Sequence, residues 1–337
     1  MIAPAFNISL LTVGAAALAL LIVIVFVAVK LMRCKRRIQA LRTSSTMLQG
    51  SAAPVALRVN LVQVSINDHK AIFEDVIIAL QAAFKDLGIP CIRTENEFVD
   101  GAINVVIGSV MFVSEQVAAA LKGKPYVLYQ MEQLAADRGH LPNFPGYVGL
   151  MRDALCVWDY SLSNIEQLAQ MGITRVAHVP AGFHSALEVL AHDQPKDIEV
   201  LFYGALTPRR EHIIRALRDR GVAAEALFGM YGDARNSIIA RAKILLNLHA
   251  VEIDTLEEIR LSYLLANRCF VISELSDHNP YGDGVVFRPY DQLVETCVHY
   301  LQAGDEVRQE IANCGYQAIR KLDYTEFVRK AVQKLAM

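Results

Sequence analysis

The sequence predicts an α/β protein with two Rossmann-like domains, preceded by one transmembrane helix. From residue 57 to the C-terminus, strand-length runs rich in Val and Ile alternate with runs of helical periodicity. This alternation is typical of parallel sheets covered by helices on both faces. It is interrupted once, at residues 181–197, and restarts at residue 198. Residues 57–337 are long enough for two domains of about 100–200 residues each, and the stretch before Lys30 carries no charged side chain.

The N-terminal segment has the composition of a membrane anchor. It is dense in Leu, Ile, Val and Ala between Ile8 and Val29, and basic residues follow it: Lys30, Arg33, Lys35, Arg36, Arg37 and Arg42. About 20 apolar residues cross a bilayer as one helix, whereas a cleaved secretory signal carries its charge before the apolar run. We therefore expect an anchor with a basic flank at residues 1–42 and a linker at 43–56. The positive-inside rule places everything after the anchor in the cytoplasm, as in a single-pass protein of the cytoplasmic (inner) membrane.

The first Rossmann-like domain is expected at residues 57–180. Apolar, β-branched runs predict strands at 57–66, 89–94, 102–109, 124–130, 154–161 and 174–180. Helical periodicity predicts helices at 68–88, near 114–121 and at 161–170. The glycine at position 88 is a stop signal for the first of these helices.

Residues 181–197 are the predicted interdomain connector, because they contain Gly182, Pro195 and a charged polar end. The second Rossmann-like domain is expected at residues 198–337. Its predicted strands lie at 198–204, 223–229, 243–249, 269–274 and 284–289, and its helices at 208–221, 233–242, 255–267 and from 290 to the C-terminus.

The charge distribution argues against a nucleic-acid binder. The basic cluster beside the anchor accounts for much of the positive charge, so the rest of the chain is somewhat acidic. A nucleic-acid-binding protein instead presents a basic face. The cysteines show no CxxC or Cys/His ligand spacing, so we interpret them as reduced thiols and predict no metal site.

Polar residues at strand ends are the candidate site, because ligands of open parallel sheets bind at the carboxyl ends of the strands. In the second domain, Gly204 ends the first strand, and Arg209 and Arg210 begin the next helix. A helix N-terminus offers free N–H groups, and arginine adds bidentate contacts to an anion. Gly204, Arg209 and Arg210 together would therefore suit a diphosphate. Arginines at a helix start are also common as ordinary solvated residues.

Five motifs within residues 155–274 resemble, in order and spacing, a bacterial group of GT-B glycosyltransferases. They are VWDYS followed by N, VLFYG followed by RR, LFG.YG..R, AK..LN.H, and E..R.SYLLAN followed by V.SE. The second domain resembles the C-terminal, donor-binding domain of the family 1 and family 4 enzymes. The resemblance implies transfer of a sugar from a nucleotide-sugar donor to a glycan, lipid or protein acceptor. It also implies no metal and no further cofactor, because cationic side chains stabilise the leaving diphosphate.

The resemblance extends the donor site to the third strand of the second domain and the helix that follows it. His249 ends this strand, Glu252 and Glu257 are expected at the start of the helix, and Arg260 lies one turn further on. The helix dipole favours carboxylates at a helix start whatever their function. These residues are therefore donor-site candidates with an alternative structural role.

One departure from the resemblance concerns the stereochemistry of transfer. Many retaining GT-B enzymes have two glutamates eight residues apart at this helix. Here Asp254 and Ser262 take the corresponding positions. The sequence therefore leaves open whether the transfer is retaining or inverting.

Three residues of the first domain are candidates for the catalytic base that takes a proton from the acceptor. His69 follows the first strand, Glu132 follows the strand at 124–130, and Asp159 lies near the end of the strand at 154–161. Histidine titrates near physiological pH, which suits it to this role. Each of the three also fits a structural role as a helix cap or a loop hydrogen-bonding group.

The sequence leaves two alternatives to an active glycosyltransferase of the cell envelope. A GT-B protein that has lost catalysis would bind a sugar or nucleotide as a scaffold, which agrees with the missing glutamate pair. A membrane-anchored solute-binding protein would also have two α/β domains, but it would need them outside the cytoplasm.

The charge asymmetry around residues 1–42 predicts the orientation of the chain in the membrane. A protease added to intact cells is expected to leave the region after Lys30 uncut, because that region is in the cytoplasm. Immunoblotting of the treated cells checks this. Digestion of the large region would contradict the orientation and favour the solute-binding alternative.

Overall fold

The computed structural model describes residues 57–64, 68–108, 115–134, 145–252 and 255–335, with the backbone alone at 68–70, 115 and 145. Leu57–Met337 form one compact unit. The predicted anchor, basic flank and linker lie outside the described residues. Among the described helices, none is both long enough and apolar enough to cross a membrane.

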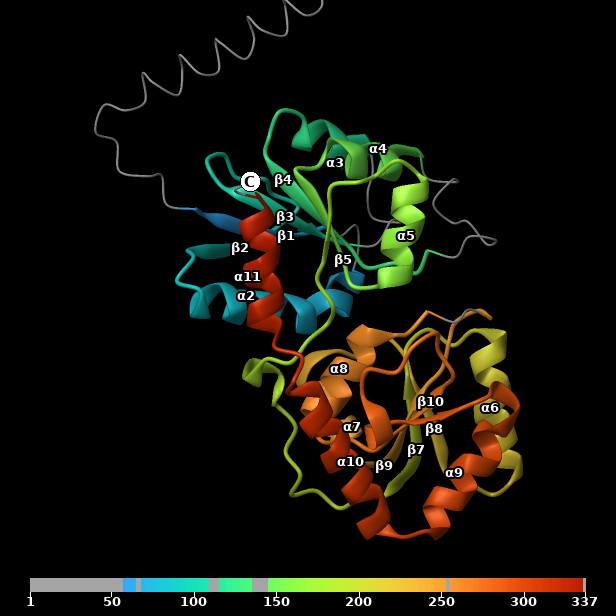
Figure 1. Cartoon of the computed structure of the whole chain (residues 1–337). Coiled ribbons are helices and arrows are strands. Elements are labelled where there is room, and N and C mark those ends of the chain that lie inside the picture. Colours follow the sequence, from blue (N-terminus) through green and yellow to red (C-terminus); the bar gives the residue numbers. More distant parts are fainter. Residues whose placement is uncertain (1–56, 65–67, 109–114, 135–144, 253–254, 336–337) are drawn as a thin grey trace, which may run out of the picture. The chain divides into compact units, whose positions relative to one another are not determined.

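The first sheet has six parallel strands in the order β2-β1-β3-β4-β5-β6 (Figure 1). They are β1 (Val59–Gln63), β2 (Cys91–Glu95), β3 (Ile103–Ile107), β4 (Tyr126–Gln130), β5 (Cys156–Asp159) and β6 (Val176–His178). Every residue of β1, β4 and β5 is buried, as expected for strands covered on both faces. The strand order reverses between β1 and β3, where the loops after the two strands diverge to opposite faces.

The second sheet has five parallel strands in the order β11-β10-β9-β7-β8. They are β7 (Ile198–Tyr203), β8 (Ala224–Leu227), β9 (Ala242–Asn247), β10 (Val271–Glu274) and β11 (Val286–Arg288). Its order reverses between β7 and β9, which pair directly. The prediction of two parallel α/β sheets is confirmed, and the domain ranges stay predictions.

Helices connect the strands and cover the sheets (Figure 1). The α-helices are α2 (Glu74–Asp86), α3 (Glu115–Leu121), α4 (Pro145–Asp153), α5 (Leu162–Gln170), α6 (Pro208–Asp219), α7 (Gly232–Ala240), α8 (Glu258–Ala266), α9 (Leu293–Gln302), α10 (Asp305–Ile319) and α11 (Tyr324–Leu335). Short 3-10 helices are η1 (Asp68–Phe73), η4 (Ser185–Leu187), η5 (Gly282–Gly284) and η6 (Tyr290–Gln292).

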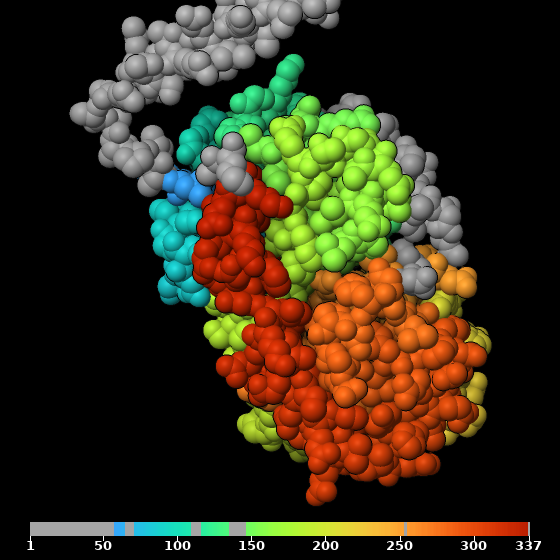
Figure 2. Space-filling view, viewed as in Figure 1, coloured from blue at the N-terminus to red at the C-terminus, as the bar shows by residue number. Residues whose placement is uncertain are grey.

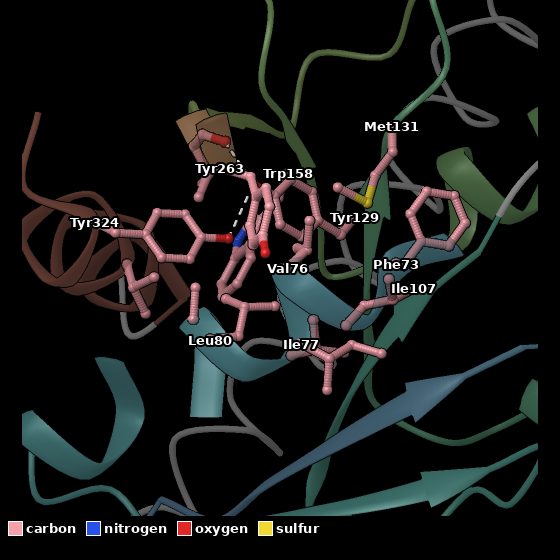
Figure 3. Close-up of a cluster of buried hydrophobic side chains, with 14 of the residues drawn as sticks. Phe73, Val76, Ile77, Leu80, Ile107, Tyr129, Met131, Trp158, Tyr263 and Tyr324 are labelled. Atoms are coloured by element: carbon pink, nitrogen blue, oxygen red, sulfur yellow. Dashed lines mark hydrogen bonds between the residues drawn. The ribbon is translucent and has the colours of Figure 1, made fainter. Parts of the chain in front are cut away.

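The last helix returns to the first sheet. The predicted second domain extends from residue 198 to residue 337, but α11 packs against α2 and β6. The Tyr324 hydroxyl lies 3.2 Å from the Tyr129 hydroxyl, which donates to the Val179 carbonyl oxygen at 2.7 Å. Figure 3 shows Tyr129, Trp158 and Tyr324 in one cluster of buried side chains. In Figure 2 the C-terminal residues form a continuous red band on the visible face.

Local structure differs from the prediction at three helices. The helix expected at 68–88 is divided into η1 and α2, and the helix expected at 255–267 begins only at Glu258. The sequence analysis did not predict α4, because Pro145, Gly146 and Gly149 weaken its helical signal. Its buried residues, such as Tyr147 and Met151, show that packing compensates for the low propensity.

Candidate active site

A cavity of about 430 Å³ lies at the carboxyl ends of β7 and β8, and the first turn of α2 faces into it. Its position follows from the second sheet, because the loops after β7 and β9 diverge where the strand order reverses. The lining residues are Ile72, Phe73, Asp75, Glu132, Tyr203, Gly204, Ala205, Arg210, Leu227, Phe228, Gly229, Met230, Tyr231, Arg235, Glu257, Ile259 and Arg260.

Gly204 brings the backbone at the end of β7 close to a cation. Its φ is +135°, a conformation that side chains disfavour, and a Cβ at this position would lie 3.2 Å from Nη2 of Arg260. Glycine therefore leaves room beside the guanidinium group. The predicted donor-site residues Gly204, Arg210, Glu257 and Arg260 all line the same cavity.

Arg210 joins the loops after β7 and β9. Its Nε and Nη2 donate to the Leu248 carbonyl oxygen at 3.0 and 2.7 Å, and its Nη1 donates to that of Ala205 at 3.0 Å. Nη2 also lies 3.0 Å from Oε1 of Glu257. Burial lowers the pKa of Arg210 to about 10, so this side chain keeps its positive charge at neutral pH.

Glu257 is shared by two arginines. Its Oε2 lies 2.9 Å from Nη1 of Arg260, which also donates to Oδ1 of Asn247 at 2.6 Å. Burial favours the neutral carboxyl, but Arg260 and Arg210 outweigh this and hold the pKa of Glu257 below its ordinary value. Nε of Arg260 is buried without a hydrogen-bond partner among the described residues.

Arg235 and Asp75 form an ion pair across the cavity. Nη1 and Nη2 of Arg235 donate to the two carboxylate oxygens of Asp75 at 2.7 and 2.9 Å. Arg235 is in the first turn of α7, which follows β8, whereas Asp75 is in the first turn of α2. The guanidinium lies over the ring of Tyr263, 4.3 Å from its centroid. The pair connects helices that belong to different sheets.

Glu132 reaches the cavity from the end of β4, on a loop fixed by buried polar groups. Gln130 accepts from the Glu132 backbone N–H at 2.5 Å and donates to its carbonyl oxygen at 2.8 Å. Asn164 donates to the same oxygen at 2.9 Å. No hydrogen bond to the Glu132 carboxylate is found among the residues that the structure describes. Glu132 is one of the residues that line the cavity.

Asp159 is fully buried behind this loop and does not line the cavity. It accepts from Gln130 Nε2 at 2.9 Å, from the Ser161 backbone N–H at 2.8 Å and from Asn164 Nδ2 at 3.1 Å. Burial raises the pKa of Asp159 to about 7. Its contacts orient the two amides that hold Glu132.

Arg209 and His249 do not line the cavity, although the sequence predicted both in the donor site. Arg209 binds Glu274 through two nitrogens, and its guanidinium lies 3.8 Å from the centroid of the Tyr290 ring. His249 is fully buried, and its Nε2 lies 3.1 Å from the Leu275 carbonyl oxygen. All three residues follow strands of the second sheet, so their positions in the sequence could not show that only Arg210 lines the cavity.

Glu252, His69, Asp254 and Ser262, the remaining residues named from the sequence, do not line the cavity in the part of the chain that the structure describes. Glu252 is exposed and precedes α8 instead of beginning it. The backbone of His69 is in η1, but its side chain lies outside the described part. Asp254 is also outside it, whereas the Ser262 hydroxyl is buried and donates to the Gly182 carbonyl oxygen at 2.9 Å.

The sequence analysis missed Asp75 and Arg235 as site residues. Arg235 is the last residue of the motif LFG.YG..R, so a signal for it was present. Asp75 had none, because acidic residues in the first turn of a helix are common. Among the described residues, no group of three His, Cys, Asp or Glu side chains is arranged to hold a metal ion.

Comparison with known proteins identifies the fold. No protein-family model matches the chain. Of the solved structures, HepE of Anabaena with UDP and glucose superposes with a TM-score of 0.57 at 12% identity, over 83% of this chain and 99% of HepE. A glycosyltransferase of Rickettsia africae gives 0.53 at 8% identity, over 83% of this chain and 98% of that one. A DNA-modifying β-glucosyltransferase gives 0.51 at 12% identity, over 83% and 100%. The chain has the GT-B fold.

Two relatives by sequence are uncharacterized proteins. An uncharacterized protein of Acanthamoeba polyphaga mimivirus is 27% identical over 196 residues, which are 55% of this chain and 62% of that protein. A second uncharacterized protein of the same virus is 30% identical over 120 residues, or 33% of this chain and 14% of that protein. The chain thus spans less than two thirds of each of these relatives.

The buried Asp159 predicts a pH dependence of stability. Its folded pKa lies above that of an unfolded aspartate, about 3.9, so the folded state binds more protons between about pH 4 and 7. Asp159 therefore contributes a decrease in the free energy of unfolding as pH rises through this window. Asp159→Asn should remove this slope, which is at most about 1.4 kcal/mol per pH unit. Urea unfolding at several pH values measures it, with the exposed Asp153→Asn as control. Parallel curves for wild type and Asp159→Asn would contradict the assignment.

Proposed function

We propose that the protein is a glycosyltransferase that transfers a sugar from a nucleotide-sugar to a hydroxyl group of an acceptor. The observation that carries this proposal is the cavity at the strand reversal of the second sheet. There Gly204, Arg210 and Arg260 meet in one place. In a chain with the GT-B fold, this arrangement suits a donor diphosphate, since buried cations stabilise the charge that develops on it.

In the proposed reaction, the two sides of the cavity have different roles. The bond between the sugar anomeric carbon and the diphosphate oxygen breaks, and the charge left on the diphosphate is stabilised by Arg210 and Arg260. The acceptor oxygen forms the new bond to the same carbon. Its proton passes to a carboxylate, and we assign this role to Glu132. Of the two carboxylates on the α2 and β4 side, Asp75 is held by Arg235 and Glu132 is not.

The other two residues predicted as candidates for the base are Asp159 and His69. Asp159 is too buried to meet an acceptor, and its hydrogen bonds instead position the loop that carries Glu132. His69 follows the first strand and stays a candidate. Neither retaining nor inverting transfer is assigned.

The location and acceptor are further parts of the proposal. An N-terminal helix would hold the enzyme at the cytoplasmic face of the inner membrane, where nucleotide-sugars are available. The acceptor is a glycan, a lipid or a protein, and no nucleic acid, metal or additional cofactor takes part. Membership of the family 1 and family 4 group is likewise proposed, on the motifs of residues 155–274.

A second candidate function is a nucleotide-sugar-binding protein without catalysis. It is favoured by the buried hydroxyl of Ser262, which donates to Gly182 and stands where retaining enzymes have a glutamate. The two functions share the cavity and differ in turnover. Consumption of donor by the purified chain would exclude the second.

Donor binding is the first test. A panel of nucleotide-sugars and nucleoside diphosphates is screened by thermal shift, because a ligand at 100 times its Kd adds about 2.7 kcal/mol of stability. Arg260→Gln should weaken the binding of the active ligand by about 1.5–3 kcal/mol, the range for hydrogen bonds to charged groups. Arg215→Gln, an exposed arginine of α6, is the matched control. A panel without any stabilising ligand would contradict the proposed function.

The role of Glu132 is tested by turnover. Glu132→Gln should lower kcat by about 10²–10⁴-fold, the usual contribution of a general base. Donor Kd should change little, since the proton of the acceptor is the partner of this carboxylate. The exposed Glu166→Gln on α5 serves as control. Near-wild-type kcat in Glu132→Gln would transfer the role to His69.

A further inference from the structure

The cavity contains as many carboxylates as guanidinium groups. Its described lining includes the cations Arg210, Arg235 and Arg260 and the anions Asp75, Glu132 and Glu257. Opposite charges at these distances largely neutralise each other. A diphosphate adds negative charge to this balanced set, so a tightly bound diphosphate requires that one cation be released from its present partner.

Two of the three cations are fixed by groups that a ligand cannot easily replace. Arg210 donates to two main-chain oxygens, those of Ala205 and Leu248. Leu248 is fully buried in the loop after β9, so its carbonyl oxygen needs a donor. Arg260 is held by Asn247, which lies within β9. These two guanidinium groups are part of the framework of the second sheet.

Arg235 differs in that its principal partner comes from the first sheet. Both carboxylate oxygens that it binds belong to Asp75, on α2. Its remaining contacts come from the second sheet and its helices, namely the amide oxygen of Asn236 at 3.0 Å and the rings of Tyr263 and Tyr203. These contacts hold the guanidinium plane when the carboxylate leaves, so Arg235 remains ready to bind another anion.

A planar guanidinium binds carboxylate and phosphate with the same two-pronged geometry. We propose that Arg235 is a ligand of the donor diphosphate and that the Asp75 carboxylate occupies its place in the free protein. The inference rests on the proposed function for the identity of the anion. Asp75 then acts as an internal competitor, and donor binding breaks the ion pair between α2 and α7.

The experiment compares the two partners of the pair. Titration calorimetry with inorganic pyrophosphate and with the nucleoside diphosphate selected by the thermal screen measures affinity for the whole 337-residue chain. Arg235→Gln should weaken binding at least about tenfold, equivalent to about 1.4 kcal/mol. Asp75→Asn should strengthen it severalfold, because the competitor is gone. Asp197→Asn breaks a second bidentate pair, with Arg241 at the exposed surface, and should leave the affinity unchanged.

The opposite effects of the two substitutions on affinity distinguish a competing carboxylate from an ion pair that only holds the helices together. If the pair only held the helices together, both substitutions would weaken binding or leave it unchanged, and either result overturns the inference. Failure of the wild type and of Asp75→Asn to bind pyrophosphate overturns it too. The proposed function is tested by a different result: it is contradicted if no nucleotide-sugar binds the wild-type protein.

A measurement on the wild type covers the case in which Asp75→Asn does not fold. The side-chain ¹⁵N signals of labelled arginine are followed by NMR, and that of Arg235 is assigned by its loss in Arg235→Lys. Pyrophosphate should shift the Arg235 signal and leave that of Arg241 in place. An unmoved Arg235 signal at saturating pyrophosphate would overturn the inference.

Discussion

The structure around the cavity depends on keeping three guanidinium groups charged and paired, of which Arg210 and Arg235 are buried and Arg260 is partly exposed. A buried charge without a partner costs several kcal/mol, so each arginine dictates what must surround it. Glu257 neutralises Arg210 and Arg260 together, and this fixes the start of α8 against the loop after β7. Gly204 follows from the same constraint, because a side chain there would press on Arg260.

The first sheet supplies the groups that complete this site. Asp75 pairs with Arg235, and Glu132 faces the cavity on a loop that Gln130 and Asn164 hold through its backbone. The return of α11 to α2 adds a second connection between the sheets, with Tyr324 beside Tyr129 in a buried cluster. The site therefore combines arginines carried by the second sheet and its helices with the carboxylates of Asp75 and Glu132 on the side of the first sheet.

Sequence reasoning predicted the sheets well, because Val- and Ile-rich runs have few alternatives to buried parallel strands. The strand ends pointed to Gly204 and Arg210, and the resemblance to GT-B enzymes pointed to Glu257 and Arg260; all four line the same cavity. Sequence reasoning could not predict which way a side chain points. Arg209 and Arg210 are adjacent, yet one binds Glu274 and the other faces the cavity. Asp75 and Arg235 form an ion pair although they lie 160 positions apart in the chain. No pattern of neighbouring residues in the sequence predicts such a contact. Asp159 was recognised as a polar strand end, but its burial depends on the packing of α5.

The most direct test of the account is a crystal structure of the chain with the nucleoside diphosphate that stabilises it most. The account predicts that the diphosphate lies at the Gly204 turn, with its oxygens within hydrogen-bond distance of the guanidinium groups that line the cavity. It also predicts that the Glu132 carboxylate faces the exposed end of the diphosphate, where the sugar of a donor would be. A diphosphate bound elsewhere, with the cavity unchanged, would contradict the assignment of the site.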